Sequence, residues 1–279
     1  MLKRAACALS LLTLAACAQA PAPAVELYAM DCGRAAFADA DAFADDGSFA
    51  GVARTLVDPC YLIRHPEGDL IWDTGFSDAV ADMPDGITVI GAHITMQHKL
   101  ADQLGQIGLT PADVEYLSFS HAHADHTGNG NLFAGATWIV DADERAYMFR
   151  PEARADAQSF GFYNELETAE TRLIEGEDDY DVFGDGSVVI IQAPGHTPGH
   201  AALLVRLRNA GPVLLTGDLW HLAESRERRT VPRFNTDREQ TLASMDKIEA
   251  LARETGARVV RQHVQEDFAA LPAFPAALN

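Results

Sequence analysis

The chain has 279 residues, of which 48% are hydrophobic and 22% are charged. This composition is typical of a globular protein that can bury a sizeable core, and it excludes an intrinsically disordered chain. The formal net charge of −20 excludes a nucleic-acid partner, because phosphate binding needs a basic face, and it favours a small neutral or cationic substrate.

The first 17 residues have the pattern of an export signal. A basic start, MLKR, leads into the apolar run AACALSLLTLAA, which is too short to span a bilayer. The run ends at Cys17 in the sequence LAAC, which resembles the lipobox of bacterial lipoproteins. We therefore predict that Cys17 is lipidated. An ordinary cleaved signal that happens to carry a cysteine is the alternative.

This prediction defines the expected organisation and location of the protein. Residues 1–17 form the signal peptide and lipobox, residues 18–24 a tether, and residues 25–279 the folded domain. The protein is expected on the periplasmic side of the bacterial cell envelope, where the N-terminal lipid provides its membrane contact. No sequence pattern indicates an oligomeric state.

The cysteines leave one pair inside the folded domain. Cys7 is lost with the signal, so Cys32 and Cys60 remain beside the lipidated Cys17. An exported domain can oxidise such a pair to a disulfide, but two separate buried thiols fit the sequence equally well. No C-x-x-C pair is present, so a structural zinc ribbon is not indicated.

From about residue 25 onward, short apolar runs alternate with Gly, Pro and Asp. The predicted strands are residues 25–30, 55–65, 69–75, 115–121, 136–141, 188–194, 201–207, 212–218 and 257–263. Several are apolar at consecutive positions, as in strands covered on both faces. Helical spacing predicts helices over 95–108 and 235–256. The second has a capping box, Thr236 with Glu239, and ends at Gly256.

Residues 150–187 are acidic and weakly periodic. We predict a solvated surface loop over this segment, since most segments of this kind are loops. The alternative is that its aromatic residues, Phe160, Phe162 and Tyr163, form the roof of a pocket.

Metal-binding side chains crowd into the stretch SHAHADH. The candidates share one position, the end of a predicted strand: His121, His123, Asp125, His126, His196, Asp218 and His263. Strand ends at one edge of a sheet can converge. Imidazole with carboxylate suits zinc or a comparable divalent ion. Five histidines and two aspartates exceed one tetrahedral site, so we predict two divalent metal ions, Zn²⁺ being favoured.

These motifs resemble the metallo-β-lactamase superfamily. HAHADH matches its H-x-H-x-D-H signature, and APGHTPGH, TGDLW and RQH match its later ligand motifs. The resemblance spans about residues 25–275 and implies an α/β fold, a four-layer αββα sandwich with the metals at one edge of two sheets. The implied ligands are His121, His123 and His196 for one ion, Asp125, His126 and His263 for the other, and Asp218 as the bridge.

The segments CYLIRHPEGDLIWDTG and PGHTPGHAALLV are most similar to the N-acyl homoserine lactonase branch. This resemblance implies a hydrolase that opens acyl homoserine lactones with a hydroxide bridging two zinc ions. Asp125 is then placed to pass a proton to the leaving oxygen. Other esters, phosphotriesters or β-lactams are alternative substrates, and a non-catalytic metal-binding lipoprotein is the alternative class.

Some positions depart from the lactonase pattern or support its site. The branch usually has Tyr where this chain has His221, which we predict to assist the oxyanion; a solvent-exposed loop histidine is the alternative. Val264 stands where an Asp often follows the last ligand. The resemblance implies that Asp73 supports the ligand loop by hydrogen bonding. For His200 we favour a packed core residue over a support for the ligands.

Overall fold

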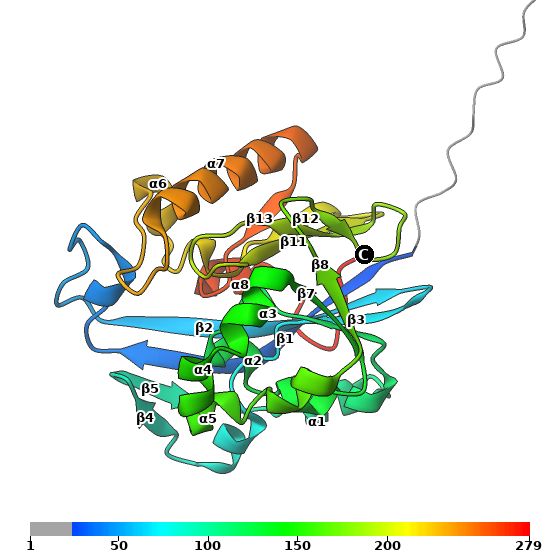
Figure 1. Cartoon of the computed structure of the whole chain (residues 1–279), viewed down its shortest axis with the longest axis horizontal. Coiled ribbons are helices and arrows are strands. Elements are labelled where there is room, and N and C mark those ends of the chain that lie inside the picture. The colour runs from blue at the N-terminus through cyan, green and yellow to red at the C-terminus, as the bar shows by residue number, and fades with distance from the viewer. Residues whose placement is uncertain (1–23) are drawn as a thin grey trace, which may run out of the picture.

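The computed structural model describes residues 24–279 and shows two stacked β-sheets with helices outside them (Figure 1). The predicted signal, Cys17 and nearly all of the tether lie outside these residues. The first sheet has the strand order β4-β5-β1-β2-β3-β6-β7-β8, and the second has β13-β12-β11-β10-β9. Within residues 24–279, the helices are all too short or too polar to cross a membrane.

Each predicted strand is present in the structure. The first sheet contains β1 Glu26–Phe37, β2 Arg54–His65, β3 Gly68–Trp72, β4 Ile87–Val89, β5 Ala92–Thr95, β6 Tyr116–Ser118, β7 Thr137–Asp141 and β8 Thr171–Ile174. The second contains β9 Tyr180–Asp181, β10 Val188–Gln192, β11 Ala201–Leu207, β12 Gly211–Leu215 and β13 Arg258–Val260. Strands β4, β5, β8 and β9, of two to four residues each, were not predicted.

The main core lies between the two sheets, and successive residues of one strand point to opposite faces. Tyr61 and Ile63 of β2 pack against the second sheet, for example near Leu203. Leu62, between them, joins the cluster on the outer face of the first sheet. Both faces are therefore buried, which explains the continuous apolar run in this strand and confirms the αββα sandwich.

Helix α7 (Arg238–Thr255) covers the outer face of the second sheet through Met245 and Ile248 (Figure 1). The predicted capping box was wrong by one residue. The Asp237 carboxylate caps the helix by accepting a hydrogen bond from the Gln240 N–H at 2.9 Å. The N–H groups of Thr236 and Asp237 both donate to the loop around residue 196, so neither is free for a capping box. The predicted stop is confirmed, since Gly256 adopts a left-handed φ of 67°.

The other outer layer contains helices α1 (Leu100–Gln106) and α3 (Ala142–Met148) (Figure 1). Helix α1 is shorter than predicted because the Asp78 carboxylate accepts hydrogen bonds from the N–H groups of Leu100 and Ala101 and so fixes its start. The remaining α-helices are α2 Ala124–Thr127, α4 Pro151–Ala155, α5 Ala157–Phe160, α6 Ser225–Arg228 and α8 Gln265–Ala269. The 3-10 helices are η1 Asp41–Phe43, η2 Asp78–Asp82, η3 Pro111–Asp113, η4 Gly130–Phe133, η5 Asn164–Thr168 and η6 Gly217–Leu219.

Residues 150–187 are not the continuous solvated loop that we predicted. The segment contains α4, α5, η5, β8 and β9. Tyr163 is buried, packs against Phe149 and Phe160, and donates a hydrogen bond to the Met148 carbonyl. Phe160 and Phe162 also pack onto the core outside the first sheet. The aromatic residues therefore anchor the segment to the core instead of roofing a pocket.

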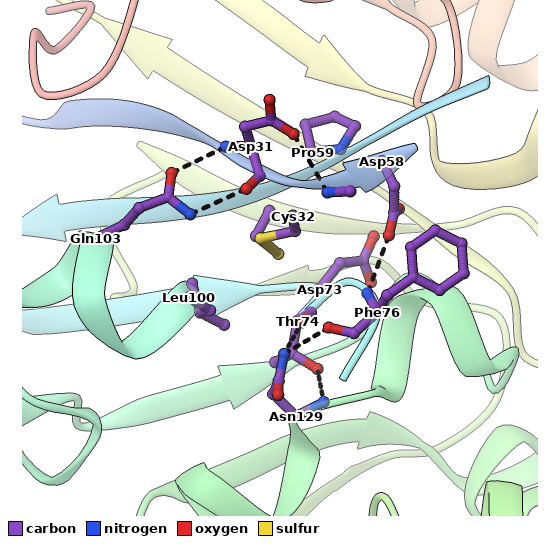
Figure 2. The surroundings of a disulfide bond; sticks show 12 residues. Asp31, Cys32, Asp58, Pro59, Asp73, Thr74, Phe76, Leu100, Gln103 and Asn129 are labelled. Atoms are coloured by element: carbon purple, nitrogen blue, oxygen red, sulfur yellow. Dashed lines mark hydrogen bonds between the residues drawn. A yellow bond between two sulfur atoms is a disulfide. The ribbon is translucent and has the colours of Figure 1, made fainter. Parts of the chain in front are cut away.

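Cys32 of β1 and Cys60 of β2 form a disulfide, which decides between the two alternatives (Figure 2). Their Cα atoms are 5.8 Å apart, and both residues are fully buried. The loop after β3 lies directly against this disulfide. A Cβ atom added to Gly75 would lie 2.2 Å from Cys32 Cβ and 2.9 Å from Cys60 Sγ, and Gly75 has a φ of +63°. Only glycine can occupy this position without moving the loop.

The other side of the same loop is held by Asn129 (Figure 2). Its Nδ2 donates hydrogen bonds of 2.8 Å to the carbonyls of Thr74 and Phe76. Its backbone N–H donates to Thr74 Oγ1. The loop that carries Asp73 is thus fixed between the disulfide and the segment that follows the SHAHADH stretch.

Candidate metal centre

The structure brings all seven predicted ligands together in two groups. The first group is His121, His123, His196 and Asp218, and the second is Asp125, His126 and His263. Within each group, the candidate ligand atoms lie within 4.8 Å of one another. The residues follow β6, β10, β12 and β13, so the centre lies where strands of both sheets end.

Asp218 lies between the two groups. Its Oδ2 is 3.5 Å from Nε2 of His121 and 3.6 Å from Nε2 of His196. Its Oδ1 is 3.4 Å from Nε2 of His126 and 2.8 Å from Nε2 of His263. One carboxylate therefore presents a different oxygen to each group, which is the arrangement needed for a shared ligand.

Burial and charge divide the histidines into two sets. Burial, with the charges of neighbouring histidines, holds the pKa values of His121 and His196 well below the usual range. Burial also disfavours charge on His263, but the Asp218 carboxylate outweighs it and raises the pKa of His263 to about 9. The pKa of His126 is likewise raised, because Asp218 and other carboxylates outweigh its burial. The Asp218 carboxylate thus favours positive charge on this side of the centre, whether a proton or a cation supplies it.

The outward-facing nitrogens of the ligands are held by hydrogen bonds. His126 Nδ1 lies 3.0 Å from Asp73 Oδ2, and Asp73 Oδ1 accepts a 2.6 Å hydrogen bond from the Ser120 N–H. His196 Nδ1 lies 3.2 Å from Asn235 Oδ1. His263 Nδ1 donates to the Val57 carbonyl at 2.8 Å. These contacts leave the Nε2 atoms of the three histidines directed at the centre. Asp73 therefore lies where the resemblance placed it.

His200 is a packed core residue, as we favoured, and it also contacts the backbone of Asp218, as in the alternative. It is fully buried, and Nδ1 donates to the Ala193 carbonyl at 2.9 Å. Nε2 accepts a 3.0 Å hydrogen bond from the backbone N–H of Asp218. Burial lowers the pKa of His200 to about 4, which keeps Nε2 free to accept this bond. This partner is 18 residues away, so sequence spacing gave no sign of it.

His221 points into the centre and is not a solvent-exposed loop residue. Its Nε2 lies 2.9 Å from Asp218 Oδ2, and only 2% of the residue is exposed. Its ring packs 5.3 Å from Phe43 and 5.5 Å from Phe234, measured between centroids. Phe234 also lies 5.7 Å from His196 and remains 44% exposed. It therefore forms an apolar, accessible wall beside the ligands.

Sequence reasoning missed both phenylalanines and a buried carboxylate, Asp58. Asp58 Oδ2 accepts a hydrogen bond from the Phe76 N–H at 3.1 Å, whereas Oδ1 is buried without a partner (Figure 2). Burial, with the nearby charge of Asp125, raises the pKa of Asp58 well above the usual range. The sequence signal at this position was a charged residue inside an apolar strand, in TLVDPCYLI, which usually marks a partnered or functional group.

Comparison with known proteins decides the family. The sequence profile of the Metallo-beta-lactamase superfamily matches residues 55–263. The chain belongs to this superfamily. An N-acyl homoserine lactonase, AttM of Azorhizobium caulinodans, is 35% identical over 217 residues, which cover 74% of this chain and 81% of the relative. The N-acyl homoserine lactonase AiiA of Bacillus thuringiensis subsp. kurstaki is 28% identical over 223 residues, covering 77% and 84%.

Solved structures give the same answer for the fold. An N-acyl homoserine lactone hydrolase with N-hexanoyl-L-homoserine bound at its catalytic metal centre matches with a TM-score of 0.76 and 25% identity, covering 91% of this chain and 98% of that one. AidC, a dizinc quorum-quenching lactonase, shares the fold at 17% identity with a TM-score of 0.65. The predicted superfamily membership and its lactonase-like character are confirmed, and this metallo-β-lactamase superfamily member is a hydrolase.

Proposed function

We propose that this chain is a binuclear zinc-dependent lactonase that opens the ring of N-acyl homoserine lactones. The observation that carries the proposal is the position of Asp218, whose two oxygens face separate groups of histidines. The N-acyl homoserine lactonases among its relatives support the substrate class. Hydrolysis of such lactones would remove acyl homoserine lactone signals, which is quorum quenching.

The residues present fit two zinc ions. Nitrogen and carboxylate donors in groups of about three, with one carboxylate shared, match the preference of zinc. His121 Nε2 and His123 Nδ1 lie 2.8 Å apart, and His126 Nε2 is buried without a hydrogen bond. Buried nitrogens that face one another are explained if cations lie among them. Zinc at such a centre supplies Lewis acidity and a water-derived nucleophile near neutral pH.

Two side chains of the centre have proposed roles in the reaction. The Asp125 carboxylate is 30% exposed and lies 3.9 Å from His126 and 3.8 Å from His263, at the accessible side of the second group. It would carry a proton to the ring oxygen as the lactone C–O bond breaks. His221, beside Asp218, would donate a hydrogen bond to the carbonyl oxygen as negative charge develops on it.

Charge and shape also support this substrate class. A net charge of −20 repels anions, and an acyl homoserine lactone is neutral. The exposed face of Phe234, next to His123 and His196, offers an apolar surface for an acyl chain. The ring of Phe43, which is only 6% exposed, packs 5.6 Å from Phe234 and supports this surface from behind.

The test is a product assay with purified, zinc-loaded protein. The panel contains N-hexanoyl- and N-decanoyl-homoserine lactone, an aryl ester, paraoxon as a phosphotriester and nitrocefin as a β-lactam. We expect ring-opened acyl homoserine, detected by mass spectrometry as the gain of one water, and no product after chelation. If an ester, phosphotriester or β-lactam is turned over faster than the lactones, that compound class is the substrate of the same centre. No metal-dependent hydrolysis of any substrate would leave a non-catalytic metal-binding lipoprotein.

We further propose that the protein is exported and anchored by a lipid at Cys17 on the periplasmic side of the envelope. The LAAC sequence supports this proposal, and so does the Cys32–Cys60 disulfide, because such bonds persist in oxidising compartments. An alkyne-tagged fatty acid fed to the source bacterium should label the protein. Label retained in a Cys17→Ser variant would contradict the anchor.

A further inference from the structure

We propose that Glu144 is a positioning residue whose buried carboxylate holds together the two loops that carry the three histidines of the first ligand group. The proposal rests on the metal centre proposed above. Glu144 lies in the first turn of α3, and only 2% of the residue is exposed. Oε1 accepts a hydrogen bond from the Ala122 N–H at 2.7 Å, and Oε2 accepts one from the Gly199 N–H at 2.8 Å.

The two N–H groups belong to separate ligand loops. Ala122 lies between His121 and His123 in the loop after β6. Gly199 lies in the turn that begins with His196, after β10. Glu144 is 22 residues from the first partner and 55 from the second, so one side chain joins two segments that are distant in sequence. It does so beside a backbone hydrogen bond of 2.8 Å from the Ala201 N–H to the Ser120 carbonyl. The Glu144 carboxylate therefore contributes to the relative position of the three histidines.

The loop around Gly199 also lies tightly against the start of α3. A Cβ atom added to Gly199 would lie 2.2 Å from Asp141 Oδ1 and 2.7 Å from the backbone nitrogen of Glu144. The next residue, His200, accepts the hydrogen bond from the Asp218 N–H at 3.0 Å. The Glu144 carboxylate therefore holds the turn that carries both His196 and His200, the residue that contacts the Asp218 backbone.

Glu144→Gln tests this role without changing side-chain volume. The amide of Gln places an NH₂ donor against one of the two N–H donors, so one loop contact is lost. We expect the three-histidine group to bind Zn²⁺ about 10- to 100-fold more weakly, while the second group keeps its affinity. Asp181→Asn is the matched control, because the Asp181 carboxylate accepts from the N–H groups of Gly184 and Gly186 in a turn of the second sheet.

The full chain would be titrated with Zn²⁺ against a chromophoric chelator, and with Co²⁺ while visible absorption bands are recorded. Glu144→Gln should shift one of the two binding phases, and Asp181→Asn should shift neither. Two unshifted phases, or an equal shift of both together with a lower melting temperature of the metal-free protein, would overturn the positioning role.

This measurement also separates the two proposals. If the wild-type protein binds two Zn²⁺ but opens no lactone, the proposed substrate is refuted. The role of Glu144 is then still tested by the Zn²⁺ titration of the variants. Wild-type protein that binds no Zn²⁺ would overturn both.

Discussion

The Asp73 carboxylate lies 3.0 Å from Nδ1 of His126, although 53 residues separate them in sequence. The same carboxylate accepts a hydrogen bond from the Ser120 N–H, and Asp73 adopts a left-handed φ of 57°. A non-glycine residue in this conformation costs about 1 kcal/mol or more and persists where surrounding contacts hold it. The contact therefore connects the loop after β3 to the ligand stretch.

We expect Asp73→Asn to weaken zinc binding by the second ligand group about 10- to 100-fold. The carboxylate faces two donors, the Ser120 N–H and His126 Nδ1, and the amide NH₂ of Asn cannot accept a hydrogen bond from either. Metal content after dialysis against a weak chelator measures this loss. The histidine ligands themselves are unchanged, so added zinc should restore activity. A variant that retains two ions at wild-type affinity would show that the hydrogen bond does not orient His126.

Asp218→Ala should convert a centre for two ions into one that holds at most one firmly. Both groups lose a ligand at once, because each Asp218 oxygen serves a different set of histidines. Lactone turnover should fall more than about 100-fold, a larger effect than that expected from a supporting residue. Elemental analysis gives the ion count, and ring opening gives the rate. Unchanged stoichiometry would exclude Asp218 as the bridge.

Phe234→Ala should change the preference for acyl-chain length. The exposed ring offers apolar surface beside His123 and His196, and its loss should cost a long chain about 1 kcal/mol, or about fivefold in affinity. We expect KM for N-decanoyl-homoserine lactone to rise by this factor, with kcat and the KM of a short-chain lactone little changed. Phe183→Ala is a control, since that ring stacks on His65. Equal effects on both chain lengths would contradict the prediction.

Burial raises the pKa of Glu144 to about 7, despite the N–H donors that lower it. The ordinary value is 4.5, so between pH 4.5 and 7 the folded protein holds a proton that the unfolded chain releases. The stability contributed by this group therefore falls as pH rises through that window, by about 3 kcal/mol, and is constant above it.

Urea unfolding of the metal-free protein at several pH values measures this effect. Glu144→Gln removes the titration and leaves the other groups in place, so the wild-type free energy of unfolding minus that of the variant should decrease from pH 4.5 to 7. A difference independent of pH would mean that Glu144 titrates normally.

Reduction of the Cys32–Cys60 disulfide should lower both stability and metal occupancy. A native disulfide typically contributes about 2 to 4 kcal/mol to the free energy of unfolding. This one also lies against Gly75 in the loop that carries Asp73 (Figure 2). The double variant Cys32→Ala/Cys60→Ala should therefore melt earlier and lose zinc faster to a chelator than wild type. Unchanged zinc release in a less stable protein would separate the two effects.

The ligands could be predicted from sequence because their signal is local. Four of them fall within SHAHADH, and the others follow apolar strands in recognisable motifs. The nine predicted strands were predictable for the same reason, since each lies in a segment with enough apolar residues to be distinguished from a turn.

The supports of the centre could not be predicted in this way. Glu144 acts through two hydrogen bonds, across 22 and 55 residues, and His200 accepts one across 18. No spacing rule encodes such contacts. Phe234 lies in a polar segment before α7 and faces the ligands only because the backbone around residue 236 is tied to the His196 loop. The misplaced helix cap has the same origin, since a tertiary contact occupies the Thr236 backbone.

Asn235, the residue after Phe234, restricts how this enzyme can acquire new substrates. Asn235 contacts Nδ1 of His196 and donates hydrogen bonds to the Gly195 carbonyl and Thr241 Oγ1. Substitutions that reshape the loop for a bulkier substrate therefore also disturb His196. Directed evolution of selectivity should accumulate changes around Phe43, whose ring packs 5.6 Å from that of Phe234, and leave the 234–235 segment with its original backbone.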